Sequence, residues 1–258
     1  MLAILLVLAL GAADAVRTYD TSATRAAGAK LNVHLVCHTH DDGGWLKTFD
    51  EYYFGSRADI QVASVQTILD AVVLALQANP DRKFVYAETG FFSRWWGDQS
   101  AGTQDLVRRL VAAGQLDFVN GGWVQHDEAA AHYVAMIDQT TRGHRFLNAT
   151  FGRVPRVGWQ IDPFGHSATQ ASLLAGALGF DALFFGRADY QDMDIRRAQH
   201  AMELVWRGAA SYGRCADIFT HNYPSGNYGP PGGFFFEYAF TSDPPPHGRP
   251  HQPHLQHP

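Results

Sequence analysis

Short runs of apolar, β-prone residues alternate along the chain with longer stretches in which apolar residues recur at helical spacing. The short runs predict buried strands at residues 33–37, 83–88, 116–120, 156–161 and 181–187. The longer stretches predict helices at residues 60–79, 104–114, 128–148 and 168–178. Strands and helices that alternate with short loops are typical of an α/β fold, in which helices surround a mainly parallel sheet.

Polar side chains occur where the expected strands end. They are His40, Asp42, Glu88, Asn120, Asp162 and Arg187. In parallel α/β folds the residues that carry chemistry gather at the carboxyl ends of the strands, so we expect these side chains on one side of the sheet. Four aromatic residues follow the second strand, and they indicate either a substrate wall or a satellite hydrophobic cluster: Phe91, Phe92, Trp95 and Trp96.

The segment His38-Thr39-His40-Asp41-Asp42-Gly43-Gly44-Trp45 ends the first apolar run. On an extended chain, His40 and Asp42 point to the same side, and imidazole beside carboxylate is typical of a site for a borderline metal ion. The alternative is that Asp42 caps a following helix. Asp41 is expected either to accept a hydrogen bond from a ligand histidine or to be a solvated carboxylate.

Asp162 lies at a second strand-to-loop junction, in Gln160-Ile161-Asp162-Pro163-Phe164-Gly165-His166-Ser167. Pro163 biases Asp162 toward an extended conformation. Asp162 is therefore expected to supply a third ligand beside His40 and Asp42. Its alternative role is to cap the next helix, but Ser167 is better placed for that. His166 is expected to be structural.

Composition and charge narrow the class of protein. The chain has 258 residues, of which 46% are hydrophobic and 17% charged, and its formal net charge is −5. These values predict a globular protein with a sizeable core and no nucleic-acid partner. They favour no particular oligomeric state.

The two ends of the chain differ from its middle. Residues 2–12 are almost purely aliphatic and Ala13-Asp14-Ala15 follows, so residues 1–15 are expected to be a cleaved signal peptide too short to span a membrane. No membrane contact is expected in the mature form. Residues 243–258 contain six prolines and four histidines, which predicts a disordered tail.

A glycosylation motif and the two cysteines bear on whether the protein enters the secretory pathway. Asn148-Ala149-Thr150 is an acceptor sequence for N-glycosylation. Only Cys37 and Cys215 are present. A buried free thiol at Cys37 is favoured over a disulfide between them.

Three blocks of sequence resemble the N-terminal domain of glycoside hydrolase family 38, and within it the lysosomal α-mannosidases. They lie at residues 38–47, 121–128 and 160–167, and the resemblance covers roughly residues 31–212. It implies a barrel-like α/β domain of a zinc-dependent, retaining exo-α-mannosidase that acts on mannose-terminated oligosaccharides or glycoprotein glycans. A lysosomal or secreted location is implied as well.

The resemblance also implies roles for individual residues. His40, Asp42 and Asp162 would bind zinc, and Asp162 would also be the nucleophile. Trp45 and Phe164 would line the sugar subsite, and Arg187 would steady the nucleophile. Retaining glycosidases use two carboxyl groups, one as the nucleophile and one as the acid that protonates the leaving oxygen.

The sequence departs from the family pattern in two places. Gly43 replaces an apolar residue or proline, which is expected to loosen the loop. The acid/base aspartate and a fourth zinc ligand have no matching motif in residues 213–258, so a C-terminal truncation and weak or absent turnover are expected. The alternatives are an inactive or mannose-binding remnant that keeps Trp45 and Phe164, and a zinc-dependent deacetylase on a related barrel.

Overall fold

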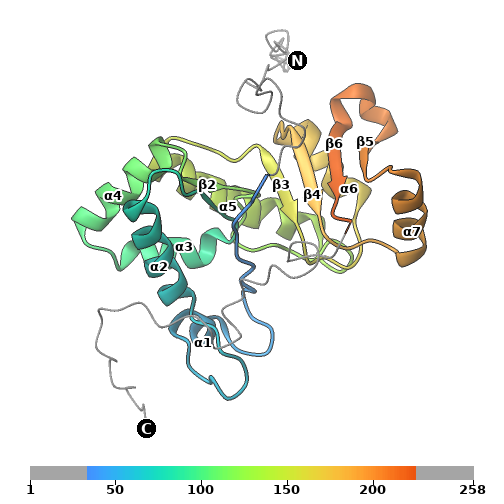
Figure 1. The fold of residues 1–258 in the computed structure, drawn as a ribbon. Coiled ribbons are helices and arrows are strands. Elements are labelled where there is room, and N and C mark those ends of the chain that lie inside the picture. The colour runs from blue at the N-terminus through green and yellow to red at the C-terminus, as the bar shows by residue number, and fades with distance from the viewer. Residues whose placement is uncertain (1–33, 225–258) are drawn as a thin grey trace, which may run out of the picture. The chain divides into compact units, whose positions relative to one another are not determined.

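The computed structural model describes residues 34–224 as an α/β fold (Figure 1). The expected signal peptide and the expected disordered tail lie outside these residues. The helices are α1 Phe49–Phe54, α2 Val65–Ala78, α3 Thr89–Gly97, α4 Ala101–Ala112, α5 Tyr133–Phe151, α6 Ala168–Ser172 with a π-helical turn Leu173–Ala177, α7 Tyr190–Gln199 and a 3₁₀ segment Ala210–Ala216. The strands are β1 Phe84–Tyr86, β2 Leu116–Phe118, β3 Val157–Gln160, β4 Ala182–Phe185, β5 Glu203–Arg207 and β6 Asp217–Asn222.

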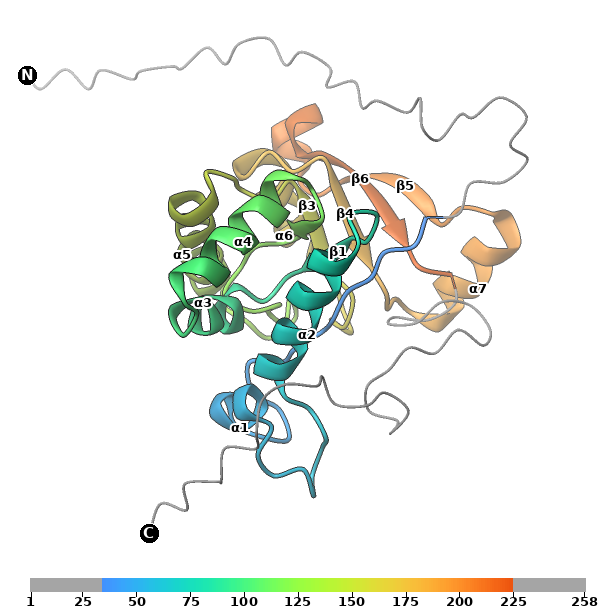
Figure 2. The same ribbon diagram turned by 60° about the vertical axis from the view of Figure 1, so that its left-hand side comes forward.

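The strands form a parallel pair, β1-β2, and a four-stranded sheet in the order β3-β4-β6-β5. All neighbours are parallel except β5 and β6, so the predicted mainly parallel arrangement is confirmed. Helices α2 to α5 gather on the β1-β2 side, and α7 lies near β5 and β6 at the opposite end (Figures 1 and 2). Among the described strands the two sheets are not closed into a ring, and the barrel-like closure stays a prediction.

Asn120 joins the two sheets. Its backbone N–H donates to the Val157 carbonyl at 2.7 Å, its Oδ1 accepts from the Trp159 N–H at 3.2 Å, and its Nδ2 donates to Gln160 Oε1 at 3.2 Å. Asn120 has φ of 59°, in the left-handed region that asparagine tolerates better than most residues. Sequence placed Asn120 among the candidate chemical groups, whereas its polar atoms are used to hold β2 against β3.

The predicted strands and helices are mostly present but shorter. Helix α2 begins at Val65 rather than residue 60, because the Ser64 side chain accepts from the Thr67 N–H and caps it. Residues 34–37 are not a strand; the segment has only a bridge from His38 to Val85. Helix α5 starts at Tyr133 rather than residue 128. Ser167 caps α6 through the Thr169 N–H, as predicted.

Five labelled elements and the 3₁₀ segment Ala210–Ala216 escaped the sequence prediction; the five are α1, α3, α7, β5 and β6. The strand ending near residue 187 was taken as the last, yet β6 pairs with both β4 and β5 and so lies inside the sheet. Strand β5 is amphipathic and contains Glu203 and Arg207, so its sequence lacks the continuous apolar run that identified the other strands.

The aromatic residues after β1 belong to the core. Phe91, Phe92 and Trp95 on α3 are fully buried, and Phe92 packs edge-on against Phe118 at a centroid distance of 4.9 Å. The satellite-cluster interpretation is therefore closer to the structure, and the substrate-wall alternative is wrong for these side chains.

The cysteines are both free and exposed. The expectation of a buried Cys37 thiol is wrong, because its segment lies alongside β1 through a single backbone bond, from the Val85 N–H to the Cys37 carbonyl, rather than inside a sheet. Asn148 of the glycosylation sequence is exposed on α5. None of the helices within residues 34–224 combines the length and the hydropathy that a membrane span needs.

Gly143 allows α5 to cross directly over the turn after β2. A Cβ atom at this position would lie 2.0 Å from the Gly121 carbonyl oxygen, which is backbone and cannot move aside easily. We expect Gly143→Ala to lower the free energy of unfolding by about 1–3 kcal/mol, as overpacking does. Urea denaturation of the purified protein measures it.

Gly102 on α4 is the matched control, because an added Cβ there meets only the Ser100 hydroxyl at 3.9 Å. Gly102→Ala should be neutral or stabilising by roughly 0.5–1 kcal/mol through helix propensity. Equal destabilisation by the two substitutions would contradict the close crossing.

His144 makes the stability of this crossing depend on pH. Its Nε2–H donates to the Asn120 carbonyl at 2.9 Å, and burial lowers the pKa of His144 despite that bond. The unfolded chain therefore takes up a proton before the folded protein does as the pH falls below about 6.5. Stability should decrease from pH 7 to pH 5, by at most about 1.4 kcal/mol per pH unit for this group.

His144→Gln, which retains a donor but does not titrate, should reduce that slope in urea denaturation at a series of pH values. An unchanged slope would show that His144 takes up its proton equally in both states.

Candidate metal centre

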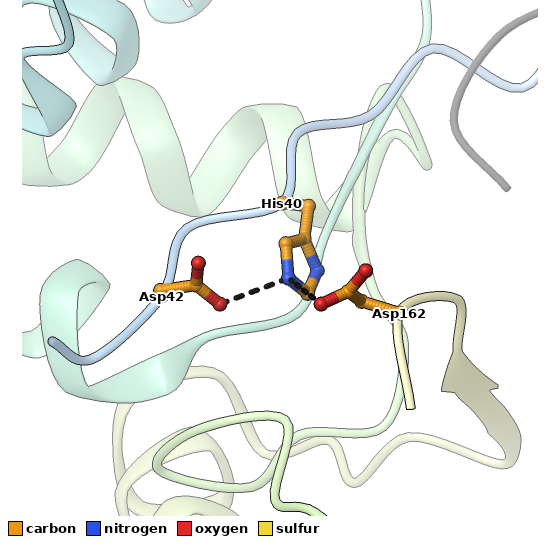
Figure 3. A group of neighbouring side chains, drawn as sticks. All are labelled: His40, Asp42 and Asp162. Carbon is orange, nitrogen blue, oxygen red and sulfur yellow. Dashed lines mark hydrogen bonds and ion pairs between the residues drawn. The ribbon is translucent and has the colours of Figure 1, made fainter. Parts of the chain in front are cut away.

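His40 and Asp42 lie in the segment that follows the bridge to β1. The His40 Nε2 atom is 3.0 Å from Asp42 Oδ1, as the alternation of an extended chain predicts (Figure 3). Asp42 does not cap α1, whose N-cap is Thr48 in a reciprocal capping box with Glu51. The helix-capping alternative for Asp42 is therefore wrong.

Asp162 approaches the same imidazole from the carboxyl end of β3. Its Oδ2 is 3.7 Å from His40 Nε2, so His40 lies between the two carboxylates in Figure 3. One possible ligand atom from each of the three residues lies within 4.8 Å of the others. The structure thus brings together the trio that the sequence nominated as metal ligands.

The donor set fits a zinc ion. Imidazole nitrogen and carboxylate oxygen are zinc donors, and ligand bonds of about 2.0–2.2 Å place neighbouring tetrahedral donors about 3.3–3.5 Å apart. The observed separations of 3.0 and 3.7 Å lie on either side of that value. The side chains of His40, Asp42 and Asp162 are 10%, 36% and 25% exposed, so a ligand can reach the site from solvent.

Asp162 is also held from its other side. The Arg187 guanidinium donates to Asp162 Oδ1 at 2.5 Å. The Nε2–H of His166 donates to the Arg187 backbone carbonyl at 2.9 Å and so helps to hold Arg187 in this position. Arg187 therefore lies where the resemblance implied, beside the candidate nucleophile. His166 contacts the backbone, in agreement with its expected structural role.

Glu128 is a site residue that sequence reasoning missed. Its buried carboxylate accepts from the Ser167 N–H at 2.7 Å and from Gln160 Nε2 at 3.1 Å, and it lies 3.2 Å from His166 Nδ1. It ties the second sequence block to the loop that carries Asp162. The available signal was an acidic residue inside a recognised block, but we had assigned it to the start of a helix.

Glu88 lies behind His40 and is almost fully buried. Its Oε1 accepts from Gln125 Nε2 at 2.6 Å and lies 3.8 Å from His40 Nδ1. Burial, together with the charge of Asp41, raises the pKa of Glu88 to about 8. For His40, burial lowers the pKa, but the hydrogen bond to Asp42 and the surrounding carboxylates outweigh it and leave the pKa raised.

The other residues that the sequence singled out lie around the trio: one is a hydrogen-bonded carboxylate, two are exposed aromatic side chains and one is a glycine in a close contact. Asp41 is not a solvated carboxylate, because it accepts from the Tyr86 hydroxyl at 2.8 Å and from Thr39 Oγ1 at 3.1 Å. Trp45 and Phe164 are largely exposed, each within a few residues of a candidate ligand. Gly43 allows a close approach to Val124, since a Cβ there would lie 2.7 Å from Val124 Cγ1.

Comparison with known proteins agrees with the blocks. The family description "Glycosyl hydrolases family 38 N-terminal domain" matches residues 30–246. An "Alpha-mannosidase" of Canavalia ensiformis is 57% identical over 208 residues, which is 81% of this chain and 21% of that protein. A "Lysosomal alpha-mannosidase" of Homo sapiens is 57% identical over 204 residues, which is 78% of this chain and 20% of that protein.

The fold resembles a solved structure as well. The crystal structure of an alpha-mannosidase from Enterococcus faecalis V583 superposes with a TM-score of 0.54 at 18% identity, over 73% of this chain and 20% of that one. At that identity the likeness concerns the fold alone. The chain spans about a fifth of the length of the curated relatives it matches.

We expect the purified chain to hold one zinc ion that depends on His40. After dialysis against a weak chelator, elemental analysis should find about one zinc per chain in the wild type and a corresponding loss in His40→Ala, because the imidazole is the central donor. His221→Ala is the matched control, since His221 Nδ1 lies 2.9 Å from Glu203 and His221 does not belong to the trio of possible ligands.

Zinc bound loosely by the four histidines of residues 243–258 would remain equal in all three proteins. Equal zinc in wild type and His40→Ala would contradict the site.

Proposed function

This chain belongs to glycosyl hydrolase family 38, and on that premise we propose that it forms the zinc- and nucleophile-bearing part of a retaining exo-α-mannosidase. The substrate is terminal α-mannose of an oligosaccharide or glycoprotein glycan. The convergence of His40, Asp42 and Asp162 is the observation that carries the proposal. The chain spans about a fifth of the relatives' length, so the activity is proposed for the protein that contains this domain.

Asp162 acts as the nucleophile in this proposal. One of its oxygens bonds to the anomeric carbon while the bond from that carbon to the glycosidic oxygen breaks, through an oxocarbenium-like transition state. Water then cleaves the glycosyl ester and restores the carboxylate. The Arg187 guanidinium holds Oδ1, which orients the carboxylate for attack.

Zinc, when bound, supplies a Lewis acid that orients sugar hydroxyls. His40 and Asp42 would hold it together with Asp162. Trp45 and Phe164 are exposed aromatic side chains next to the ligand segments, and their apolar faces suit the C–H faces of a sugar ring. They are proposed to line the mannose subsite.

The departing glycosidic oxygen needs a proton from a second carboxyl about 5 Å from the nucleophile. Within residues 34–224, Asp42 is assigned to the metal, and Glu88 is buried behind His40. General acid catalysis contributes roughly 10²–10⁴-fold. Without such a carboxyl, turnover of unactivated substrates is expected to be weak.

The proposed cellular setting is the secretory pathway, with a lysosomal or secreted destination. The expected signal peptide at residues 1–15 and the exposed Asn148 support entry to that pathway. Several relatives are named lysosomal α-mannosidases.

A substrate with an activated leaving group tests the proposal directly. A dinitrophenyl α-mannoside hardly needs a general acid, so zinc-loaded wild type should hydrolyse it and transiently carry one mannosyl group on Asp162, detectable by mass spectrometry of peptides. Asp162→Asn should abolish both signals and also weaken zinc binding, since one side chain serves both purposes.

Asp192→Asn is the control, because Asp192 pairs with Arg196 on the exposed surface of α7. Turnover that survives Asp162→Asn would refute Asp162 as nucleophile. Zinc and mannose binding without any turnover of the activated substrate would favour the mannose-binding remnant.

A further inference from the structure

Two side chains, the buried Glu88 and the half-buried Gln125, link the two halves of the metal centre from behind. Gln125 Nε2 donates to Glu88 Oε1 at 2.6 Å, and Gln125 Oε1 accepts from the backbone N–H of Ile161 at 3.4 Å. Ile161 is the residue before Asp162, and Glu88 lies against His40. We call the Glu88–Gln125 pair the strap.

The two nitrogens of His40 face different surroundings. Nε2 faces the carboxylates of Asp42 and Asp162 at 3.0 and 3.7 Å, so it is the nitrogen placed to bind metal. Nδ1 lies 3.8 Å from Glu88 Oε1. A histidine that binds a metal through one nitrogen commonly donates its other N–H to a carboxylate, which fixes the ring orientation.

Helix capping does not explain the buried Glu88. Its side chain is 1% exposed, and burying a carboxyl group is unfavourable unless its partners compensate. Glu88 is the N-cap residue of α3, yet its side chain makes no capping hydrogen bond. Its Oε2 has no hydrogen-bond partner within the part of the chain that the structure describes.

We propose that the strap positions the metal ligands: Glu88 accepts the Nδ1 proton of His40, while Gln125 holds Glu88 at a set distance from Ile161 and therefore from Asp162. Glu88 and Gln125 are positioning residues that act through His40 and Asp162. The inference rests on the proposed zinc site. Positioning of His40 by residue 88 requires only a carboxyl or carboxamide oxygen at the place of Glu88 Oε1.

Substitutions of Glu88 can therefore distinguish the effect of its hydrogen-bond acceptor from the effect of its charge. Glu88→Gln can keep an oxygen at the Oε1 position and place its NH₂ where Oε2 now lies, so it should retain zinc affinity within about fivefold. Glu88→Met fills similar space without an acceptor, and its zinc affinity should fall about 10–100-fold, the usual effect of losing the partner of a ligand histidine.

Gln125→Met cuts the strap while leaving Glu88 in place. It should also weaken zinc binding, and its effect should not add to that of Glu88→Met, because residues acting through one network are coupled. This variant keeps the test available should Glu88→Met fail to fold. In the metal-free protein, Gln125→Met should also speed hydrogen exchange of the Ile161 amide.

Thr89→Val is the matched control. Thr89 follows Glu88 directly, is fully buried, and loses one hydrogen bond, from Thr89 Oγ1 to the Gly121 carbonyl at 2.9 Å. Its zinc affinity should stay within about threefold of the wild type. Any general loosening of this part of the core would affect Thr89→Val as much as the strap variants.

The experiment is zinc titration of the full chain against a chromophoric chelator, with thermal denaturation of each metal-free variant alongside. Loss of affinity in Glu88→Met and Gln125→Met, with retention in Glu88→Gln and Thr89→Val, supports the strap. Unchanged affinity in both methionine variants, or equal losses in Thr89→Val, overturns it and leaves the zinc site intact. Absence of His40-dependent zinc in the wild type overturns the zinc site and the strap together.

Discussion

The hydrogen bonds of Asn120 are the constraint on which the rest of the arrangement depends. They join the end of β2 to β3, and β2 in turn pairs with β1. Glu88 follows the carboxyl end of β1, and Asp162 follows the carboxyl end of β3. Because those two ends are held side by side, a ligand segment lying along β1 can meet a ligand at the end of β3. The left-handed backbone of Asn120 and the turn at Gly121 are what this joint requires.

Carboxyl groups are concentrated around His40 at some cost in stability. Like charges in a half-buried site repel, and each buried polar group loses its solvation unless a partner replaces water. Glu128 accepts hydrogen bonds from Gln160 and from the Ser167 N–H, whereas Glu88 retains an oxygen without a partner among the described residues. A bound cation would relieve the repulsion between Asp42 and Asp162. This is the usual relation between functional sites and the folds that hold them, in which local rules are broken where chemistry occurs.

The site has a hydrogen-bonded back and an accessible front. Behind it, the hydrogen bonds of Gln160 join the third recognised sequence block to the second at His126 and Glu128. Gln125 in turn joins the second block to Glu88 and to Ile161. In front, Trp45 and Phe164 are exposed, and the ligand side chains remain partly open to solvent. Such a division suits the glycosidase activity that we propose, because a nucleophilic carboxylate must keep its position while a sugar enters and leaves.

The sequence alone determined the alternation of strands and helices, the cap at Ser167 and the pairing of His40 with Asp42, because each depends on local spacing. It nominated Asp162 as a third ligand from its strand-to-loop junction, but only the tertiary structure brings Asp162 to His40. The sequence could not determine that β6 inserts between β4 and β5, since strand order depends on pairing between distant segments. Nor could it show that Phe91, Phe92 and Trp95 are core, that Cys37 is exposed, or that Glu88 and Glu128 support the site. Those facts depend on which buried neighbours each side chain meets, and only the tertiary structure brings these neighbours together.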